Sequence, residues 1–190
     1  MQKKRFVPMA LAALVLAWNV GVLGEEGQQT DQTQRELGMA MENMAKVMLD
    51  MPMDDRPAYM MRQQEESTGR GSALFEDASL GSNGRTCDSC HPGGGTTGGE
   101  AEIPMQGRFP MNPRLPIPTL AGAAASFPKY KVPNDAVITL EGMNNNCIKM
   151  FMMGNGLDLG SQQARDLVTF VSTLSNGEEV SVGRMEMMRR

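Results

Sequence analysis

The sequence is poor in cysteine, histidine and aromatic residues. Its 190 residues include three cysteines, one histidine, one tryptophan, two tyrosines and six phenylalanines. Three is an awkward number for a framework of disulfides, because such frameworks use cysteines in pairs. A single histidine excludes a metal centre that is held by two histidines of the same chain. After residue 24 no apolar run is long enough to cross a bilayer as a helix, since a span needs about 20 residues.

The beginning of the chain has the organisation of a secretory signal peptide. Three basic residues at positions 3–5 precede an apolar run over 6–23, and Gly24 ends that run before a polar stretch. This order predicts cleavage after Gly24 and export, so the expected location is periplasmic or otherwise extracytoplasmic. An uncleaved membrane anchor is the alternative, although the apolar run is at the short end for a spanning helix.

The chain carries a negative net charge. The charge is −4 at neutral pH, and removal of a leader with three basic and no acidic residues changes it to −7. A negative surface argues against nucleic acid and anionic lipid as partners, because both are negative themselves. It suits a basic redox partner protein, and it leaves the oligomeric state open.

We expect one folded domain with an extension on each side. The predicted parts are a signal peptide (1–24), a Met- and Gln-rich extension with an amphipathic helix (25–69), a folded domain (70–176) and a charged C-terminal tail (177–190). A mature chain of this length supports a single domain.

Apolar spacing and capping residues predict four helices, over 34–49, 72–75 and 139–153 and from 162 onwards. Residues 63–71 are expected to form a polar linker. Thr139 and Ser161 are suitable N-caps for the two C-terminal helices, since their hydroxyls can accept from the first free backbone amides. Between residues 92 and 118, glycine and proline dominate and exclude a long helix or a central strand.

Residues 87–91 have the Cys-x-x-Cys-His spacing of a covalent haem attachment site. Two thiols one helical turn apart can form thioethers with the two vinyl groups of a porphyrin. We therefore predict one covalent haem c on Cys87 and Cys90, with His91 as the proximal iron ligand. A backbone carbonyl of the Pro-rich loop is expected to hold the other ring nitrogen of His91. A zinc site is the weaker alternative, because it would need Cys147 as its fourth ligand.

A covalent cofactor also explains why the chain has few aromatic residues for a core. The cofactor replaces much of the core that a domain of about 100 residues would need. The arrangement resembles the general cytochrome c fold, in which the first and last helices cross beside the haem. The expected fold is therefore mainly α, a small cytochrome c domain whose long Gly/Pro-rich loops wrap around one haem.

The sixth iron ligand is open at this point of the argument. With one histidine in the chain, the candidates are a methionine, Cys147, a lysine or no protein ligand. Met143, Cys147 and Met150 are spaced i, i+4 and i+7, so a helix would bring them to one face. Cys147 is the first candidate and Met150 the alternative.

The sequence from Pro116 to Ser175 resembles a known family of haem proteins. It contains P-I-P-T-L-A-G-A-A-A-S-F-P-K-Y, then I-T-L-E-G-M-N-N-N-C, and then the last predicted helix. These stretches are similar to the N-terminal haem domain of thiosulfate dehydrogenases and, more distantly, to the catalytic haem subunit of the sulfur-oxidising Sox system. With the haem motif, the resemblance spans residues 70–176. It implies that Cys147 is the distal iron ligand.

The sequence departs from that family beside Cys147. After the matching cysteine the enzymes place an arginine and a serine that help to hold an anionic substrate, where this chain has Met150 and Phe151. The arginine expected shortly before the cysteine is Met143 here. Thioethers and a phenyl ring cannot bind an oxyanion. The expected function is therefore electron transport, one electron at a time, between redox partner proteins. The alternative is a haem-thiolate subunit of a thiosulfate oxidoreductase, so enzymatic activity stays an open question.

Methionine is abundant, with 19 residues in the chain. Leu37, Met41, Met44 and Met48 fall on one face of the first predicted helix. Flexible methionines that pack an apolar stripe are the preferred interpretation. Binding of Cu(I) by soft thioethers and docking of a partner protein are the alternatives.

Overall fold

The computed structural model describes residues 33–102 and 114–184. The chain divides into two compact units, Met1–Tyr59 and Met60–Arg190, which are described separately. The predicted signal peptide lies outside the described residues. Within the described ranges, no helix is both long enough and apolar enough to cross a membrane.

The described part of the first unit is helical. It consists of an α-helix over 33–45, a π-helical turn (Lys46–Asp50) and a 3₁₀ turn (Met53–Asp55). The Arg56 guanidinium donates to the carbonyls of Met48 (2.6 Å) and Met51 (3.2 Å), so it satisfies groups that the end of a helix leaves without partners. The helix predicted over 34–49 is thus confirmed.

The methionine stripe on this helix is exposed within the described residues. Side chains on the predicted face are each at least half exposed: Leu37, Met41, Met44 and Met48. The interpretation that flexible methionines fill the apolar stripe of this helix stays a prediction.

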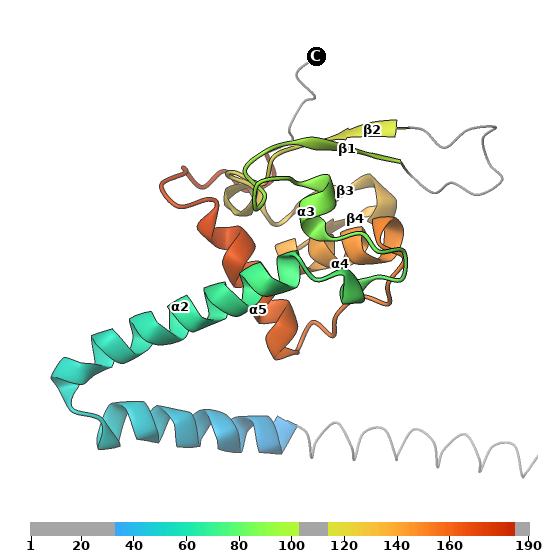
Figure 1. Cartoon of the computed structure of the whole chain (residues 1–190). Coiled ribbons are helices and arrows are strands. Elements are labelled where there is room, and N and C mark those ends of the chain that lie inside the picture. The colour runs from blue at the N-terminus through green and yellow to red at the C-terminus, as the bar shows by residue number, and fades with distance from the viewer. Residues whose placement is uncertain (1–32, 103–113, 185–190) are drawn as a thin grey trace, which may run out of the picture. The chain divides into compact units, whose positions relative to one another are not determined.

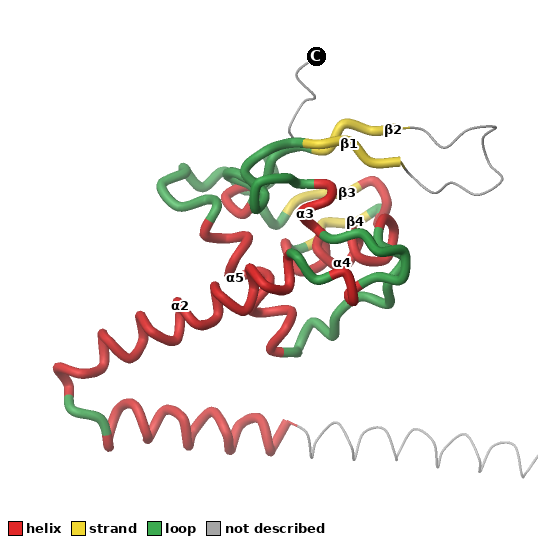
Figure 2. Tube along the Cα trace, in the orientation of Figure 1, coloured by secondary structure: helices red, strands yellow, loops and turns green. Residues whose placement is uncertain are grey.

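The second unit combines helices with two short hairpins (Figures 1 and 2). Its elements are α2 (Arg56–Phe75, which begins in the first unit), α3 (Cys87–Cys90), β1 (Gly99–Glu102), β2 (Arg114–Ile117), β3 (Lys129–Lys131), β4 (Ala136–Ile138), α4 (Leu140–Phe151) and α5 (Gln162–Thr173), with 3₁₀ turns at Ala78–Leu80, Ala124–Ser126 and Val132–Asn134. Both sheets are two-stranded and antiparallel, with Gly99 opposite Ile117 in one and Lys129 opposite Ile138 in the other. The fold is mainly α, as the sequence predicted.

Helix α2 replaces the predicted linker. The expectation of a polar linker over 63–71 is wrong, because a single helix of 20 residues runs to Phe75. Pro57 stands in its first turn, where a proline costs no hydrogen bond. Most of the polar side chains over 63–71 are exposed, so they form the solvent face of a helix.

Helices α2 and α5 cross in close contact. A Cβ on Gly71 would lie 2.0 Å from the backbone oxygen of Asp166, so only glycine permits this approach. One turn later the rings of Phe75 and Phe170 are 5.2 Å apart. The buried core continues from there through α4 and α5 and consists of Phe75, Leu140, Ile148, Met152, Leu167 and Val171.

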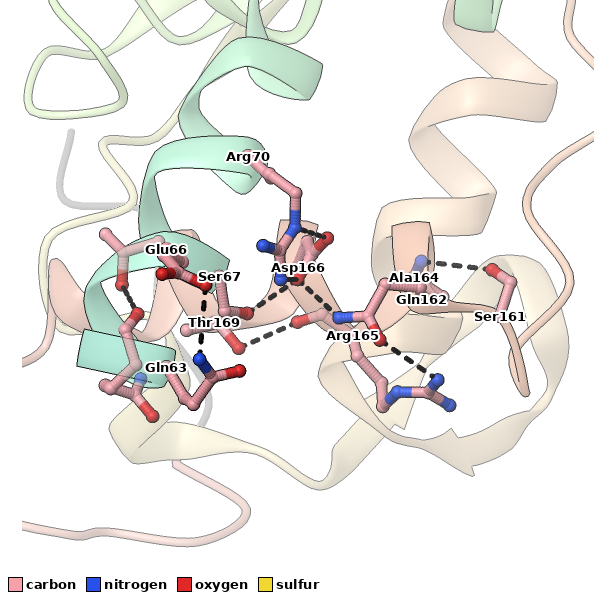
Figure 3. Close-up of polar contacts among 12 residues, drawn as sticks. Gln63, Glu66, Ser67, Arg70, Ser161, Gln162, Ala164, Arg165, Asp166 and Thr169 are labelled. Atoms are coloured by element: carbon pink, nitrogen blue, oxygen red, sulfur yellow. Dashed lines mark hydrogen bonds and ion pairs between the residues drawn. The ribbon is translucent and has the colours of Figure 1, made fainter. Parts of the chain in front are cut away.

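A buried carboxylate fixes the crossing (Figure 3). Asp166 on α5 accepts hydrogen bonds from Ser67 Oγ (2.7 Å), Arg70 Nε (2.7 Å) and Gln162 Nε2 (2.7 Å). Only 3% of its side chain is exposed, against 50% for Arg70. Hydrogen bonds from Arg70 lower the pKa of Asp166 from 3.8 to about 2, although burial opposes the shift.

The two C-terminal helices begin at the predicted caps. The Thr139 hydroxyl accepts from the Gly142 amide (3.3 Å) before α4, and the Ser161 hydroxyl accepts from the Ala164 amide (3.1 Å) before α5. After α4 the chain turns at Gly154, whose amide donates to the Ile148 carbonyl (2.9 Å). Both elements therefore start where the local sequence indicates.

The described part of the charged tail is attached to the domain. The Ser181 amide donates to the Ala125 carbonyl (2.8 Å), and the Gly183 amide donates to the Ser126 carbonyl (3.0 Å). Residues 181–183 therefore lie against the 3₁₀ turn that precedes β3.

Candidate haem site

The two cysteines of the Cys-x-x-Cys-His motif lie on one helical turn. Before α3, the Thr86 hydroxyl accepts from the Ser89 amide and the Ser89 hydroxyl accepts from the Thr86 amide, each at 3.0 Å. This reciprocal capping box stabilises a very short helix. The turn closes where the His91 amide donates to the Cys87 carbonyl (2.9 Å). The local sequence thus holds both thiols one turn apart.

The ring of His91 is oriented by the Pro-rich loop. Its Nδ1 lies 2.8 Å from the carbonyl oxygen of Pro118. A carbonyl only accepts, so Nδ1 carries the proton and Nε2 has a free lone pair. Burial lowers the pKa of His91, and the bond to Pro118 offsets part of that shift. A neutral imidazole fixed in this way is the form that binds a metal, and the carbonyl comes from the loop that the sequence indicated.

A largely apolar cavity lies beside this histidine. The empty space inside it is about 1080 Å³, with the open mouth included. Cys87, Cys90, His91 and Cys147 all line it. The walls come from α4, α5, the end of α2 and the loop over 117–123. The apolar walls and the sulfur and nitrogen atoms of these four side chains fit a haem c.

Helix α4 brings one of the two proposed distal ligands to the cavity. Cys147 lines it, together with Met143 one turn before and Phe151 one turn after. Met150 is not among the lining residues. The structure therefore places Cys147 together with Cys87, Cys90 and His91, and it leaves Met150 apart from them.

The thiols of the cavity are hard to deprotonate on their own. Burial raises the pKa of Cys87 to about 12 and that of Cys147 to about 11, from an ordinary 9.0. The positive charge of Lys131 lowers the pKa of Cys147 in part, so this lysine is electrostatically coupled to the thiol. Thiolate is the form that binds metals. A bound cation would therefore be needed to deprotonate Cys147 at neutral pH.

The polar residues of the cavity wall that the sequence-based prediction lacks include Asn144, Lys129 and Lys131. Asn144 could have been found, because it precedes Cys147 by three residues on the same predicted helix. The two lysines lie on β3, and no local pattern connects that strand with the haem motif. Their position depends on the tertiary fold.

Part of this chain is similar to known proteins. Residues 116–180 match the family described as SoxA/TsdA, cytochrome c domain. Among solved structures, SoxXA from P. pantotrophus is similar, with 22% sequence identity and a TM-score of 0.46 over 62% of this chain and 36% of that chain. The chain thus spans about a third of that relative. None of the curated proteins compared with the chain matches it. Over residues 116–180 the chain therefore resembles the cytochrome c domain of the SoxA and TsdA proteins, and haem c is the cofactor that this resemblance implies.

Proposed function

We propose that this chain is an exported electron-transfer protein with one haem c, bound covalently through Cys87 and Cys90 and coordinated by His91. The observation that carries the proposal is the position of these three side chains, together with Cys147, on the wall of one apolar cavity. When bound, the haem supplies an iron that gains and loses one electron at a potential set by its ligands.

Cys87 and Cys90 would form the covalent bonds. Each thiol adds across one vinyl double bond, with sulfur bound to one carbon and hydrogen to the other, so the addition needs no oxidant or reductant. The capping box of Thr86 and Ser89 keeps the two sulfurs on one turn. This spacing supports attachment to two vinyl groups of the same ring.

His91 and Cys147 would bind the iron. The Pro118 carbonyl holds the His91 ring so that Nε2 keeps its lone pair. Cys147 comes from α4, and the resemblance to the SoxA/TsdA domains supports it as the distal ligand. If both residues bound the iron, the protein would leave no iron position open for a substrate. Electron transfer to and from partner proteins is the function that this arrangement supports best.

A thiosulfate oxidoreductase is the second candidate. It is favoured by the family match and by Lys131, whose charge acts on the Cys147 thiol. Met143 and Phe151 argue against it, because they flank Cys147 on the cavity wall and cannot hold an oxyanion. Anaerobic addition of thiosulfate distinguishes the two candidates. We expect the ferric protein to stay oxidised, and sustained thiosulfate-dependent reduction would favour the enzyme.

Intact mass and N-terminal sequencing test the attachment and the export. The exported protein is expected to begin at Glu25 and to exceed the polypeptide mass by one haem. Cys90→Ala should lower the haem content, because one thioether holds the ring less reliably than two. A wild-type mass without haem would refute the central claim.

A pair of variants tests the distal ligand. Cys147→Ser is expected to change the low-spin ferric spectrum and to raise the reduction potential, because a thiolate stabilises ferric iron. Met150→Ala serves as the control and is expected to keep the parent spectrum. If Cys147→Ser keeps that spectrum while Met150→Ala destroys it, the iron is bound by histidine and methionine.

A further inference from the structure

Lys131 places a positive charge at the wall of the cavity. The residue lines the cavity and is partly buried. Its Nζ lies 5.5 Å from the centroid of the Phe127 ring, and Phe127 lines the same cavity. An ammonium group at this distance from an aromatic face is attracted to the ring. The charged end of Lys131, and not only its aliphatic stem, therefore lies at the wall.

The hairpin of β3 and β4 holds Lys131 beside the helix that carries Cys147. Lys131 ends β3 and stands opposite Ala136 in β4, and β4 leads into α4 through a single residue. The turn between the two strands is attached to α4, because Asn134 Nδ2 donates to Asn146 Oδ1 (3.3 Å) and Asn146 Nδ2 donates to Asn134 Oδ1. Asn146 directly precedes Cys147 in the sequence. These contacts keep Lys131 and Cys147 on neighbouring elements of one cavity wall.

The charge of Lys131 reaches the sulfur of Cys147. Burial raises the pKa of Cys147 to about 11, and the positive charge of Lys131 acts against that shift. Both side chains line a cavity whose walls are largely apolar. Charges interact more strongly in such a site than in water, because the effective dielectric constant is lower. Lys131 therefore acts on this sulfur more strongly than an exposed lysine at a similar distance would.

A positive charge beside a redox centre favours its reduced state. Reduction adds one electron, and the Coulomb attraction between that electron and a nearby cation stabilises the product. Among the described residues that line the cavity there is no aspartate or glutamate, so no carboxylate of the wall offsets the charge of Lys131. A thiolate ligand has the opposite effect, because its negative charge stabilises ferric iron. Lys131 and Cys147 would therefore change the reduction potential in opposite directions.

We propose that Lys131 raises the reduction potential of the haem, because its positive charge opposes the negative charge of a thiolate at Cys147. The inference rests on the proposed function, in which Cys147 binds the iron, and it adds the residue that adjusts the potential of that site. Lys131 is not an iron ligand in this account. It acts through Cys147 and is therefore a positioning residue, which offsets part of the fall in potential that a thiolate causes.

The test compares Lys131→Met with Lys149→Met in redox titrations of the full-length holoprotein. Each variant removes one positive charge, but Lys149 is exposed and is not among the residues that line the cavity. Lys131→Met is expected to keep its haem and to lower the ratio of ferrous to ferric protein at the wild-type midpoint by on the order of threefold to tenfold. Lys149→Met should stay close to wild type, because solvent screens an exposed charge. Lys131→Arg keeps the charge and should restore most of the ratio.

Three results would overturn the proposal. The first is a Lys131→Met protein with a full haem content and an unchanged potential. The second is an equal fall in Lys131→Met and Lys149→Met, which would assign the effect to the net charge of the protein. The third is a fall that Lys131→Arg does not restore, or a low-spin ferric spectrum that changes with the potential, which would assign the effect to packing around Cys147. If Lys131→Met does not fold, Lys131→Gln carries the same measurements and criteria. Wild type without haem would instead refute the proposed function.

Discussion

The carboxylate of Asp166 is expected to stabilise the crossing of α2 and α5 in a pH-dependent way. Its pKa is lowered from 3.8 to about 2, and each unit corresponds to about 1.4 kcal/mol. The shift is therefore worth about 2 kcal/mol as an upper value, since the half-exposed Arg70 is partly screened by solvent. Because the pKa is lowered on folding, this stability is present above about pH 4 and is lost as the pH falls towards 2.

Asp166→Asn removes the charge and keeps the shape of the side chain. At pH 7 the variant should lose about 1–2 kcal/mol of unfolding free energy in urea titrations followed by circular dichroism. At pH 3 the difference from wild type should fall to about half, because the wild-type carboxylate then contributes less. Asp158→Asn is the matched control, an exposed aspartate just before α5, and should change stability by less than about 0.5 kcal/mol. A difference that is equal at both pH values would refute the electrostatic account.

Two further predictions concern the helices. Gly71→Ala should destabilise the protein by several kcal/mol in the same assay, because its Cβ would clash with the Asp166 backbone oxygen. The added Cβ of Gly69→Ala meets nothing within 4 Å. This control variant should therefore gain up to about 1 kcal/mol of stability from helix propensity. If both changes have the same sign, the close contact of the two helices is not what requires Gly71. Ser161→Ala should cost about 1 kcal/mol by removal of the N-cap of α5, and an unchanged thermal midpoint would count against that cap.

The sequence predicts the parts of this fold that local rules determine. Thr139 and Ser161 mark the starts of α4 and α5 because a cap needs only its own hydroxyl and an amide three residues later. The motif over 87–91 is likewise local, and it predicts a haem without reference to the rest of the chain. The family resemblance adds Cys147, which lines the cavity as expected.

The parts that the sequence does not predict depend on tertiary contacts. The polar residues over 63–71 suggest a linker, yet Gly71 belongs to a helix because α5 must approach it closely. Packing supplies the stability that two glycines remove from the helix. Lys129 and Lys131 reach the cavity through β3. Asn144 is recognised as a cavity residue only from the packing of α4. No periodic pattern in the sequence indicates contacts between residues that lie so far apart along the chain.

The hydrogen bonds of Ser181 and Gly183 connect the C-terminal segment with the wall of the cavity. Their amides bind the carbonyls of Ala125 and Ser126, and Ser126 in turn bonds the Lys129 side chain inside the cavity wall. An affinity tag is therefore best joined after residue 184. Carboxypeptidase trimming past Ser181 would remove both bonds, so residues that do not line the cavity would still affect the site proposed for the haem.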